Sequence, residues 1–383
     1  MDFTYTDEQR ELAASIRRFF ERHYDFTARH RIVASDPGWS RDAWAHLAEL
    51  GVLALPLPED CDGYGGRAVD LVPFMQSAGE ALLVEPYVAT VALCARMIAR
   101  GGSPAQRGDM LAAIAAGKLV MAFAHGERHA RYRLCQVETR ARKVGDGYVI
   151  DGDKRVVLGA PCANALIVSA RLSGDACDES GIALFVVDVE RPDVRLRSYR
   201  TLDESRAADV TLSGVTLPES ARLGDEAFPL IEDAVDYATA LTCAEACGAI
   251  KSANDATLEY VKTRKQFGVP IGSFQALQHR LVDMYIEGEQ ALSMALLACT
   301  AVDEESDPVQ RKRLVSAAKI RIAQACRRVS QEAIQLHGGM GMSDEMKVSH
   351  TFRRLTMIAQ QFGDIDHHLE RFAACEAAEG VPR

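Results

Sequence analysis

A short segment in the C-terminal half carries residues suited to holding a phosphate-bearing cofactor. It reads TRKQFGVP and runs over residues 263–270. Arg264 ends a helical run and offers a planar fork of donors that matches a pyrophosphate. Phe267 can pack on a flat ring, and Gly268 and Pro270 turn the chain immediately afterwards. The segment therefore predicts contact with a cofactor that has both phosphates and rings.

A second segment, QLHGGMGM, covers residues 335–342. Gly338 and Gly339 have no side chains, so a cofactor can approach the backbone closely there. Each segment also has a plainer interpretation. Arg264 can be a solvated charge at a helix end, and the two glycines can serve only to shape a turn.

Acidic and imidazole groups gather near the C-terminus at four positions: Asp364, Asp366, His367 and His368. Adjacent histidines on a helix face different directions, so they are poor joint metal ligands. Cys243 and Cys247 lie one helical turn apart, but a zinc site needs further closely spaced ligands. We therefore expect no metal. Three roles stay open for Asp364: a helix-capping carboxylate, a general base, or a cofactor contact.

Length and composition bound what the chain can be. Its 383 residues predict more than one domain, and 48% hydrophobic residues are enough for a sizeable core. A formal net charge of −10 argues against a nucleic-acid partner. The sequence has neither a secretory signal pattern nor a stretch typical of a membrane span. Ten scattered cysteines favour free thiols in the reducing cytoplasm.

The elements that must position these residues follow from the pattern along the chain. Residues 1–118 are helical, residues 119–223 are rich in short β-like runs, and residues 224–383 are helical again. In the middle region Asp151 and Gly152 separate two such runs and predict a hairpin. The last region predicts a four-helix bundle with helices over 231–263, 276–302, 309–337 and 347–379. The fold class is therefore mainly α with a central antiparallel β domain.

The two cofactor segments resemble known motifs. Residues 263–284, TRKQFGVPIGSFQALQHRLVDM, resemble the most characteristic stretch of the acyl-CoA dehydrogenase family, and residues 335–342 resemble its glycine motif. Their order and separation, and the helix–β–helix organisation, are similar to that family along nearly the whole chain. The resemblance implies FAD bound across a subunit boundary. By position, it implies these cofactor residues: Arg264, Phe267, Phe274, Gln275, Gln335, Gly338 and Gly339.

The family's usual catalytic base is missing. Its members commonly carry a glutamate before a Gly-Thr near the C-terminus, which removes the α-proton of the thioester while hydride passes from the β-carbon to the flavin. In this chain Phe362 stands in the place of the glutamate, and Asp364 stands in the place of the threonine. A phenyl ring cannot accept a proton. Asp364 is thus the nearest alternative base in sequence.

A second position that holds the glutamate in some relatives also fails. Counting back from Arg264 places it at Ala238, and the neighbouring arginine that helps to hold CoA is replaced by Thr239. The resemblance implies Asp236 and Gly363 as substrate-binding residues.

The β region departs from the family as well. The usual Thr-Glu-Pro…Gly-Ser-Asp stretch is replaced by HGERHARY over residues 125–132, and the Trp-Ile-Thr beside the flavin becomes Val156, Val157 and Leu158. The ending FGDIDHH resembles small subunits of pimeloyl-CoA dehydrogenase and related mixed-subunit enzymes. In such enzymes two unlike chains can share each flavin, and one of them lacks the base.

The expected function is FAD-dependent α,β-dehydrogenation of an acyl-CoA thioester by one subunit of a mixed-subunit enzyme, in an assembly such as a tetramer. The expected partners are the thioester and either a homologous subunit or a second copy of the chain, with an electron-transfer flavoprotein as a candidate acceptor. The branch resemblance suggests dicarboxylyl, branched or steroid-derived acyl groups. Two alternatives remain: a non-catalytic partner subunit, and a flavoprotein of the same fold with other chemistry.

Overall fold

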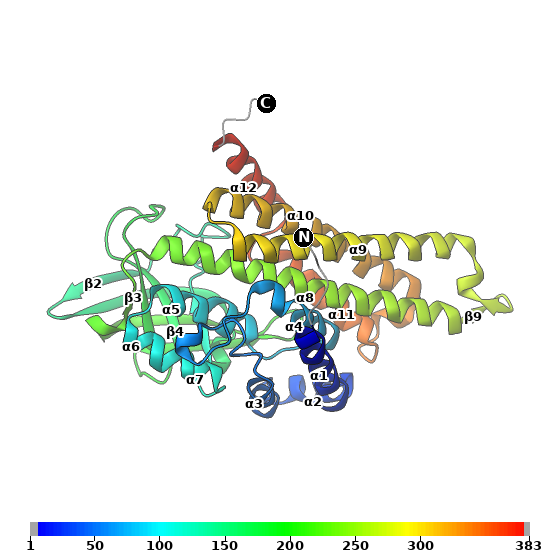
Figure 1. Ribbon diagram of the computed structural model, residues 1–383, viewed down its shortest axis with the longest axis horizontal. Helices are drawn as coiled ribbons and strands as arrows, with labels where there is room; N and C mark the ends of the chain where they lie inside the picture. Colours follow the sequence, from blue (N-terminus) through cyan, green and yellow to red (C-terminus); the bar gives the residue numbers. More distant parts are fainter. Residues whose placement is uncertain (1–6, 379–383) are drawn as a thin grey trace. The chain divides into compact units, whose positions relative to one another are not determined.

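A computed structural model describes residues 7–378 of the chain (Figure 1). These residues pack into two compact units that alternate along the sequence. The bundle unit consists of Met1–Arg29, Arg67–Leu83 and Thr239–Arg383, and the sheet unit consists of His30–Gly66 and Val84–Ala238. Each unit has a hydrophobic core of its own.

The bundle unit is built from long helices. Helix α8 (Ala227–Thr263) contributes its C-terminal part, and the other helices of the unit are α1 (Asp7–His23), α4 (Ala68–Ala81), α9 (Gln275–Glu304), α10 (Pro308–His337), α11 (Lys347–Gln360) and α12 (Ile365–Ala378). Its core is rich in alanine and cysteine, and small residues let helices approach closely. At Gly79 of α4 an added Cβ would lie 1.9 Å from the Glu245 carbonyl oxygen of α8. No helix among residues 7–378 is long and apolar enough to cross a membrane.

The predicted helix over residues 347–379 is wrong in one respect, because it is interrupted. Helix α11 ends at Gln360 and α12 begins at Ile365. Between them Phe362 has φ +61° and Gly363 has φ +128°, which are backbone angles that a right-handed helix does not permit. The periodic pattern on both sides masked this turn, although the glycine was visible in the sequence.

The sheet unit holds an eight-stranded sheet within the described residues. Its order is β6-β7-β3-β2-β4-β5-β8, and β1 pairs with β4. The strands are β1 (Met121–Ala124), β2 (Arg140–Val144), β3 (Gly147–Leu158), β4 (Ala165–Arg171), β5 (Ile182–Asp188), β6 (Val194–Arg200), β7 (Arg206–Pro218) and β8 (Arg222–Leu223). The sheet is mixed, since β4 pairs in parallel with β1 and β2. The predicted central β domain is confirmed and its other strand pairs are antiparallel, but these two pairs are parallel.

The predicted hairpin at Asp151 and Gly152 is also wrong. Both residues lie inside the single strand β3, at a register shift against β7. The tight turn comes earlier, at Gly145 and Asp146, where β2 meets β3 and Gly145 has φ +59°. Both glycine-containing dipeptides, Gly145–Asp146 and Asp151–Gly152, have the composition of a two-residue hairpin turn. Because β3 stays paired with β7 on both sides of Asp151 and Gly152, the turn forms only at Gly145 and Asp146.

Short helices complete the sheet unit. Helix α3 (Arg41–Glu49) begins after Ser40, whose hydroxyl accepts the Ala43 N–H and caps the helix. The remaining segments are η1 (Glu59–Cys61), η2 (Val88–Ala95), α5 (Arg96–Gly101), α6 (Pro104–Gln106), η3 (Arg107–Leu111), α7 (Ala112–Ala115), η4 (Ala160–Cys162) and η5 (Glu219–Ala221). Helix α2 (Phe26–Ala34) spans the boundary between the two units.

Candidate functional site

The first cofactor segment forms a strained hairpin that displays an aromatic ring. Strands β9 (Lys265–Gln266) and β10 (Val269–Pro270) pair through a two-residue turn in which Phe267 has φ +54° and Gly268 has φ +82°. A left-handed backbone costs a non-glycine residue about 1 kcal/mol. The Phe267 side chain is nevertheless 91% exposed. Strain and exposure together indicate a ring that is placed to meet another molecule.

Arg264 lies at the neck of this hairpin. Its backbone N–H donates to the Tyr260 carbonyl at 2.8 Å, and its carbonyl accepts from the Ile271 N–H at 2.8 Å. The backbone is thus fixed on both sides. The side chain is exposed, and among residues 7–378 it has no ion pair or hydrogen bond. An arginine fork in this state is available to a phosphate.

A ring pair joins the two cofactor segments, and sequence reasoning missed it. The rings of Tyr260 in α8 and His337 in α10 stack with centroids 4.4 Å apart. The His337 Nδ1 lies 2.8 Å from the Ala333 carbonyl oxygen, and burial lowers the pKa of His337. The imidazole is therefore neutral at pH 7 and can donate to that carbonyl. Arg264 and the glycine motif thus belong to one surface, since Tyr260 lies one helical turn before Arg264 and His337 directly precedes Gly338.

The glycine motif leaves space beside this surface. Gly338 ends α10 with φ +60° and ψ −142°, a combination nearly exclusive to glycine. A Cβ added at Gly338 or Gly339 would meet nothing within 4 Å. The chain's own packing therefore does not require a glycine at Gly339, and the opening is available to a ligand. The predicted cofactor residues all lie exposed on the bundle unit: Arg264, Phe267, Phe274, Gln275, Gln335, Gly338 and Gly339.

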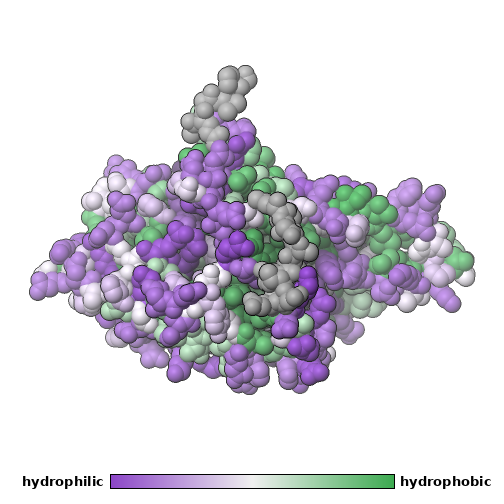
Figure 2. Space-filling model, viewed as in Figure 1, coloured by the Kyte–Doolittle hydropathy of each residue, from purple (hydrophilic) through white to green (hydrophobic). Residues whose placement is uncertain are grey.

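Apolar side chains surround the hairpin and continue along α9. Phe274, Val282, Tyr285 and Ile286 are exposed, and Phe274 makes an edge-to-face contact with Phe267 at 6.2 Å. Figure 2 shows hydrophobic residues at the surface over α9 and the hairpin. An apolar surface of this kind is typical of an interface with another protein.

Asp364 acts as a helix cap in this structure. Its Oδ1 accepts the His367 backbone N–H at 2.9 Å, at the start of α12. This was the plainest of the three roles left open from sequence. Asp364 also lines a cavity of about 590 Å³ between α10, α11 and α12, together with Arg327, Gln331 and Gln360. The carboxylate therefore reaches a cavity wall while one oxygen is engaged with the backbone.

The turn before Asp364 is held from inside the bundle. The buried Lys319 ammonium donates to the carbonyls of Ile358 at 2.8 Å, Ala359 at 3.3 Å and Gly363 at 2.9 Å. Burial lowers the pKa of Lys319. Nothing in the sequence marked this lysine, because its partners are backbone groups at the end of another helix.

His368 secures the same turn from α12. Its Nε2 donates to the Phe362 carbonyl at 3.2 Å, and its Nδ1 lies 3.2 Å from the Ser316 hydroxyl. Because both ring nitrogens are engaged, His368 has none left for a metal. A Cβ on Gly363 would lie 2.5 Å from the rings of His367 and His368, so only glycine fits. The predicted substrate-binding role of Gly363 is untouched by this packing requirement.

The predicted substrate-binding residue Asp236 and the second glutamate position, Ala238, lie on α8 in the sheet unit. Asp236 and Ala238 are fully buried, as is Thr239, the first residue of α8 assigned to the bundle unit. Because the side chain of Ala238 is a methyl group, the second glutamate position has no proton acceptor. The cysteines once considered for a metal are also committed elsewhere. The Cys247 thiol donates to the Cys243 carbonyl at 3.3 Å, and burial raises the pKa of both thiols.

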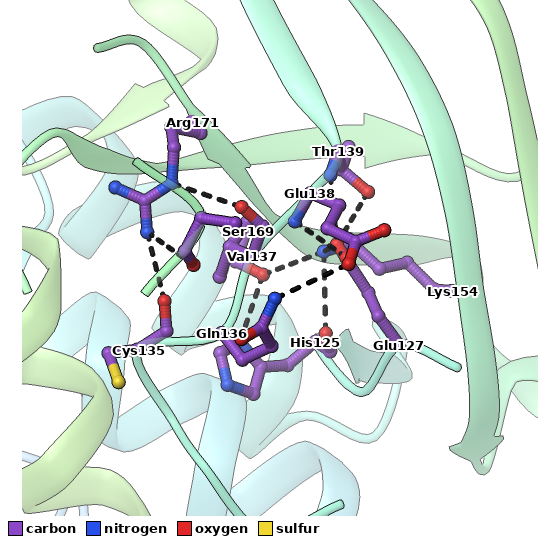
Figure 3. Close-up of polar contacts among 11 residues, drawn as sticks. His125, Glu127, Cys135, Gln136, Val137, Glu138, Thr139, Lys154, Ser169 and Arg171 are labelled. Carbon is purple, nitrogen blue, oxygen red and sulfur yellow. Dashed lines mark hydrogen bonds and ion pairs between the residues drawn. The ribbon is translucent and has the colours of Figure 1, made fainter. Parts of the chain in front are cut away.

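Glu127, in the segment of the sheet unit that departs from the family, forms a buried ion pair with Lys154 of β3 (Figure 3). The Lys154 ammonium donates to Glu127 Oε1 at 2.7 Å, to the Ser169 hydroxyl at 3.0 Å and to the His125 carbonyl at 3.3 Å. Burial lowers the pKa of Lys154 to about 8. Burial alone would raise the pKa of Glu127, but Lys154 and further hydrogen bonds bring it below its usual value.

His125 completes this network as a neutral imidazole. Burial, together with the nearby Lys154 charge, lowers its pKa to about 3. Its Nδ1 lies 2.9 Å from the Ser169 hydroxyl. Since that hydroxyl accepts from Lys154, it can donate its own proton to Nδ1. The ring also stacks on Phe123 at 5.0 Å. Sequence reasoning identified the altered segment but not its partners in β3 and β4.

The positions of the family's flavin-facing Trp-Ile-Thr lie at the end of β3. Val156 has φ +52° and is 55% exposed, whereas Val157 is buried in the core of the sheet. The Val156 N–H donates to Asp209 at 3.3 Å. The backbone is strained and exposed at Val156, and the three side chains supply neither an aromatic ring nor a hydroxyl group.

Comparison with known proteins places this architecture in a family. Three family models match in order: the acyl-CoA dehydrogenase N-terminal domain at residues 6–118, the middle domain at 122–215 and the C-terminal domain at 228–374. The chain belongs to the acyl-CoA dehydrogenase family. It is accordingly an oxidoreductase that acts on a CH–CH bond with FAD as cofactor.

Individual relatives agree with this assignment. Acyl-CoA dehydrogenase FadE12 of Mycobacterium tuberculosis is 32% identical over 89% of each chain. Among solved structures, a steroid acyl-CoA dehydrogenase variant, Tcur3481–Tcur3483, is 27% identical with a TM-score of 0.87, covering 98% of this chain and 99% of the other. The ChsE4–ChsE5 complex from M. tuberculosis is 25% identical with a TM-score of 0.87, covering all of both chains.

The residues present fit FAD unevenly. The exposed Arg264 fork, the Phe267 ring and the open glycine motif suit the phosphate-bearing and adenosine end of the cofactor. At the expected ring-facing positions, Val156 and Leu158 supply neither an aromatic side chain nor a hydroxyl donor. The bundle unit thus presents residues suited to the phosphate-bearing end of FAD, and the sheet unit lacks the ring-facing side chains that the family resemblance leads one to expect.

Proposed function

We propose that this chain is one subunit of a mixed-subunit acyl-CoA dehydrogenase and that a homologous partner chain supplies the catalytic base. The observation that carries the proposal is the turn at Phe362. It has a phenyl ring where the family has its glutamate, and the next carboxylate, Asp364, is engaged in capping α12. The second family position is the buried Ala238.

The hydrogen bonds around Phe362 support the proposal that this turn cannot present a catalytic base to the substrate. Lys319 and His368 hold the carbonyls of Phe362 and Gly363, so the turn cannot easily rotate to present Asp364 instead. Proton abstraction beside a thioester requires a carboxylate within hydrogen-bond reach of the α-carbon. A displacement of about 1 Å already lowers a rate by about 100-fold.

The same turn and the cofactor surface suggest how labour is divided. When bound, FAD accepts a hydride from the β-carbon of the substrate. In this proposal Arg264 binds a cofactor phosphate, Phe267 and Phe274 pack on its rings, and Gln275, Gln335 and the two motif glycines complete that end of the site. The substrate-binding roles of the buried Asp236 and Gly363 are proposed from the family resemblance alone, and the exposed apolar side chains of α9 meet another subunit.

The names of two similar structures give separate support to a mixed-subunit assembly. Two similar structures carry paired names, Tcur3481–Tcur3483 and ChsE4–ChsE5, and the second is described as a complex. By analogy we place this chain in a tetramer of two kinds of subunit, in the cytoplasm, and acting on a fatty or steroid-derived acyl-CoA. An electron-transfer flavoprotein is the proposed electron acceptor.

Co-expression tests the division of labour. A homologous chain from the same genome that carries a glutamate before the Gly-Thr should co-purify with this chain, and the complex should oxidise acyl-CoA thioesters. Glu→Gln at that position in the partner should abolish turnover. Asp364→Asn in this chain is the matched control, since Asn can still cap α12, and it should retain turnover. Loss of turnover in Asp364→Asn with survival in the partner variant would reverse the assignment.

A further inference from the structure

A cationic loop joins β1 to β2 in the sheet unit. We define it by Arg128, His129, Arg131 and Arg133, which are all exposed. Among residues 7–378 no carboxylate forms an ion pair with any of the three guanidinium groups. The chain as a whole carries a net charge of −10, so acidic groups are plentiful elsewhere. Three free arginines in six residues are therefore a local feature that needs an explanation.

Several other arginines of the same sheet are paired, whereas Arg195 and Arg200 of β6 have no ion pair among residues 7–378. Arg155 and Arg197 both pair with Asp209, at 2.8 and 2.6 Å, and Arg191 pairs with Asp193 at 2.8 Å. These side chains use their charge within the chain. The positive charge of the cationic loop remains available to a ligand.

Internal bonds fix the start and the end of the loop together. Glu127, directly before it, accepts the Glu138 N–H at 2.6 Å, the Thr139 N–H at 3.0 Å and the Thr139 hydroxyl at 2.7 Å. The same carboxylate is paired with the buried Lys154. Figure 3 shows these bonds converging on Glu127. The loop is thus closed at its neck by a buried ion pair, which a merely solvated charge run would not require.

A second anchor holds the C-terminal side of the loop. The buried Arg171 guanidinium donates to the carbonyls of Cys135 at 2.9 Å and Val137 at 3.0 Å (Figure 3). It also donates to the carbonyls of Ala176 and Asp178 in the adjacent loop. Unlike the arginines of the cationic loop, Arg171 donates its hydrogen bonds to backbone carbonyls and so holds the two loops in place.

The backbone between the anchors is ordered as well. The Ala130 N–H donates to the Glu127 carbonyl at 3.2 Å, and the Arg133 N–H donates to the Ala130 carbonyl at 2.9 Å. Ala130 is buried, while Arg131 takes the left-handed φ of +48°. Successive turns therefore place the arginines outward on a fixed frame. A preorganised set of donors binds an anion with less loss of conformational entropy.

We propose that the cationic loop binds the phosphates at the nucleotide end of a CoA thioester, an inference that rests on the proposed function. The nucleotide end carries a pyrophosphate and a 3′-phosphate, which arginine forks bind well. The chain has Thr239 at the position where the family resemblance implies an arginine that helps to hold CoA, so that position supplies no charge to the phosphates. The exposure of the loop fits phosphates that remain partly hydrated.

Calorimetry with 3′-phosphoadenosine 5′-diphosphate and the full chain tests the proposal without needing activity. Arg128→Gln with Arg131→Gln should weaken binding by about tenfold, from two exposed ion pairs worth about three- to fivefold each. The matched control is Arg195→Gln with Arg200→Gln, which removes two exposed charges from β6 and should leave binding unchanged. Equal affinities for the two double variants would overturn the proposal.

The catalytic complex provides a second readout. The loop variant should raise the KM for an acyl-CoA, leave kcat unchanged, and leave the KM for the matching acyl-pantetheine thioester unchanged, because that substrate lacks the nucleotide phosphates. An equal rise in KM for both substrates would overturn the proposal. If the loop variant loses nucleotide affinity but no complex turns over, the proposed function fails and the loop assignment stands. Binding of the wild-type chain to phosphatidylserine vesicles, with none to the nucleotide, would assign the loop to lipid instead.

Discussion

Replacing His125 with glutamine should make the sheet unit more resistant to acid. The imidazole is buried and neutral, with a pKa of about 3, whereas an unfolded histidine has a pKa of about 6.5. The unfolded chain therefore binds a proton between these values and the folded chain does not, so stability falls as pH falls below about 6.5. Acidification from pH 7.5 to 5.0 should remove about 2 kcal/mol through this residue alone. Glutamine does not titrate, so the variant should not lose this part of its unfolding free energy between pH 7.5 and 5.0.

The chain offers a convenient assay. Its two tryptophans, Trp39 and Trp44, are buried in the same unit as His125, so their fluorescence in urea reports the unfolding of that unit. The difference in unfolding free energy between pH 7.5 and 5.0 is measured for wild type, His125→Gln and the exposed-residue control His279→Gln. An equal acid loss in wild type and His125→Gln would show that the imidazole is not held neutral, which would refute the account of the network.

Three further predictions concern the bundle unit. Arg264→Ala should weaken FAD binding by about 2–3 kcal/mol, measured by titration of the apoprotein, whereas Lys262→Ala two residues earlier should not. Lys319→Met should destabilise the bundle by about 3 kcal/mol or more, because three buried carbonyls lose their donor; Lys262→Met is the surface control, and equal melting temperatures would contradict this. Ile286→Glu, on the exposed apolar face of α9, should shift sedimentation toward monomer, and a wild-type chain that is strictly monomeric at micromolar concentration would remove the predicted subunit interface.

Helical periodicity and turn residues were sufficient for much of the fold. The predicted helices over 231–263, 276–302 and 309–337 correspond to α8, α9 and α10 to within a few residues at each end. These segments are long and strongly patterned, so local sequence determines them. The break after Gln360 was missed because left-handed φ angles at Phe362 and Gly363 leave the hydrophobic spacing of the flanking helices intact.

Strand pairing was harder to predict, because it depends on partners distant in sequence. Asp151 and Gly152 have the composition of a hairpin turn, yet they lie within β3, where pairing with β7 carries the strand onward. The parallel pairing of β1 with β4 likewise joins residues more than forty positions apart, Met121 with Ala165. No local pattern distinguishes these outcomes.

The residues of the candidate site also divide into those that the sequence predicted and those that only the tertiary structure revealed. Arg264, Phe267 and the glycine motif were found because motif spacing and residue type suffice to suggest a phosphate and ring contact. The buried supports were not found. Lys319 binds backbone carbonyls of α11, and Lys154 binds Glu127 across the sheet unit, so both depend on the tertiary structure. The stacking of Tyr260 on His337 joins two helix ends in the same manner.

The rate of flavin reduction by the chain alone tests the central claim most directly. The purified chain is saturated with FAD and mixed anaerobically with a panel of acyl-CoA thioesters, and the loss of flavin absorbance is followed. Because neither Phe362 nor Ala238 can accept a proton and Asp364 caps α12, the account predicts reduction far slower than the ~1–1,000 s⁻¹ typical of enzymes, with no change in Asp364→Asn. Reduction within that range by the isolated wild-type chain would contradict the claim that a partner supplies the base.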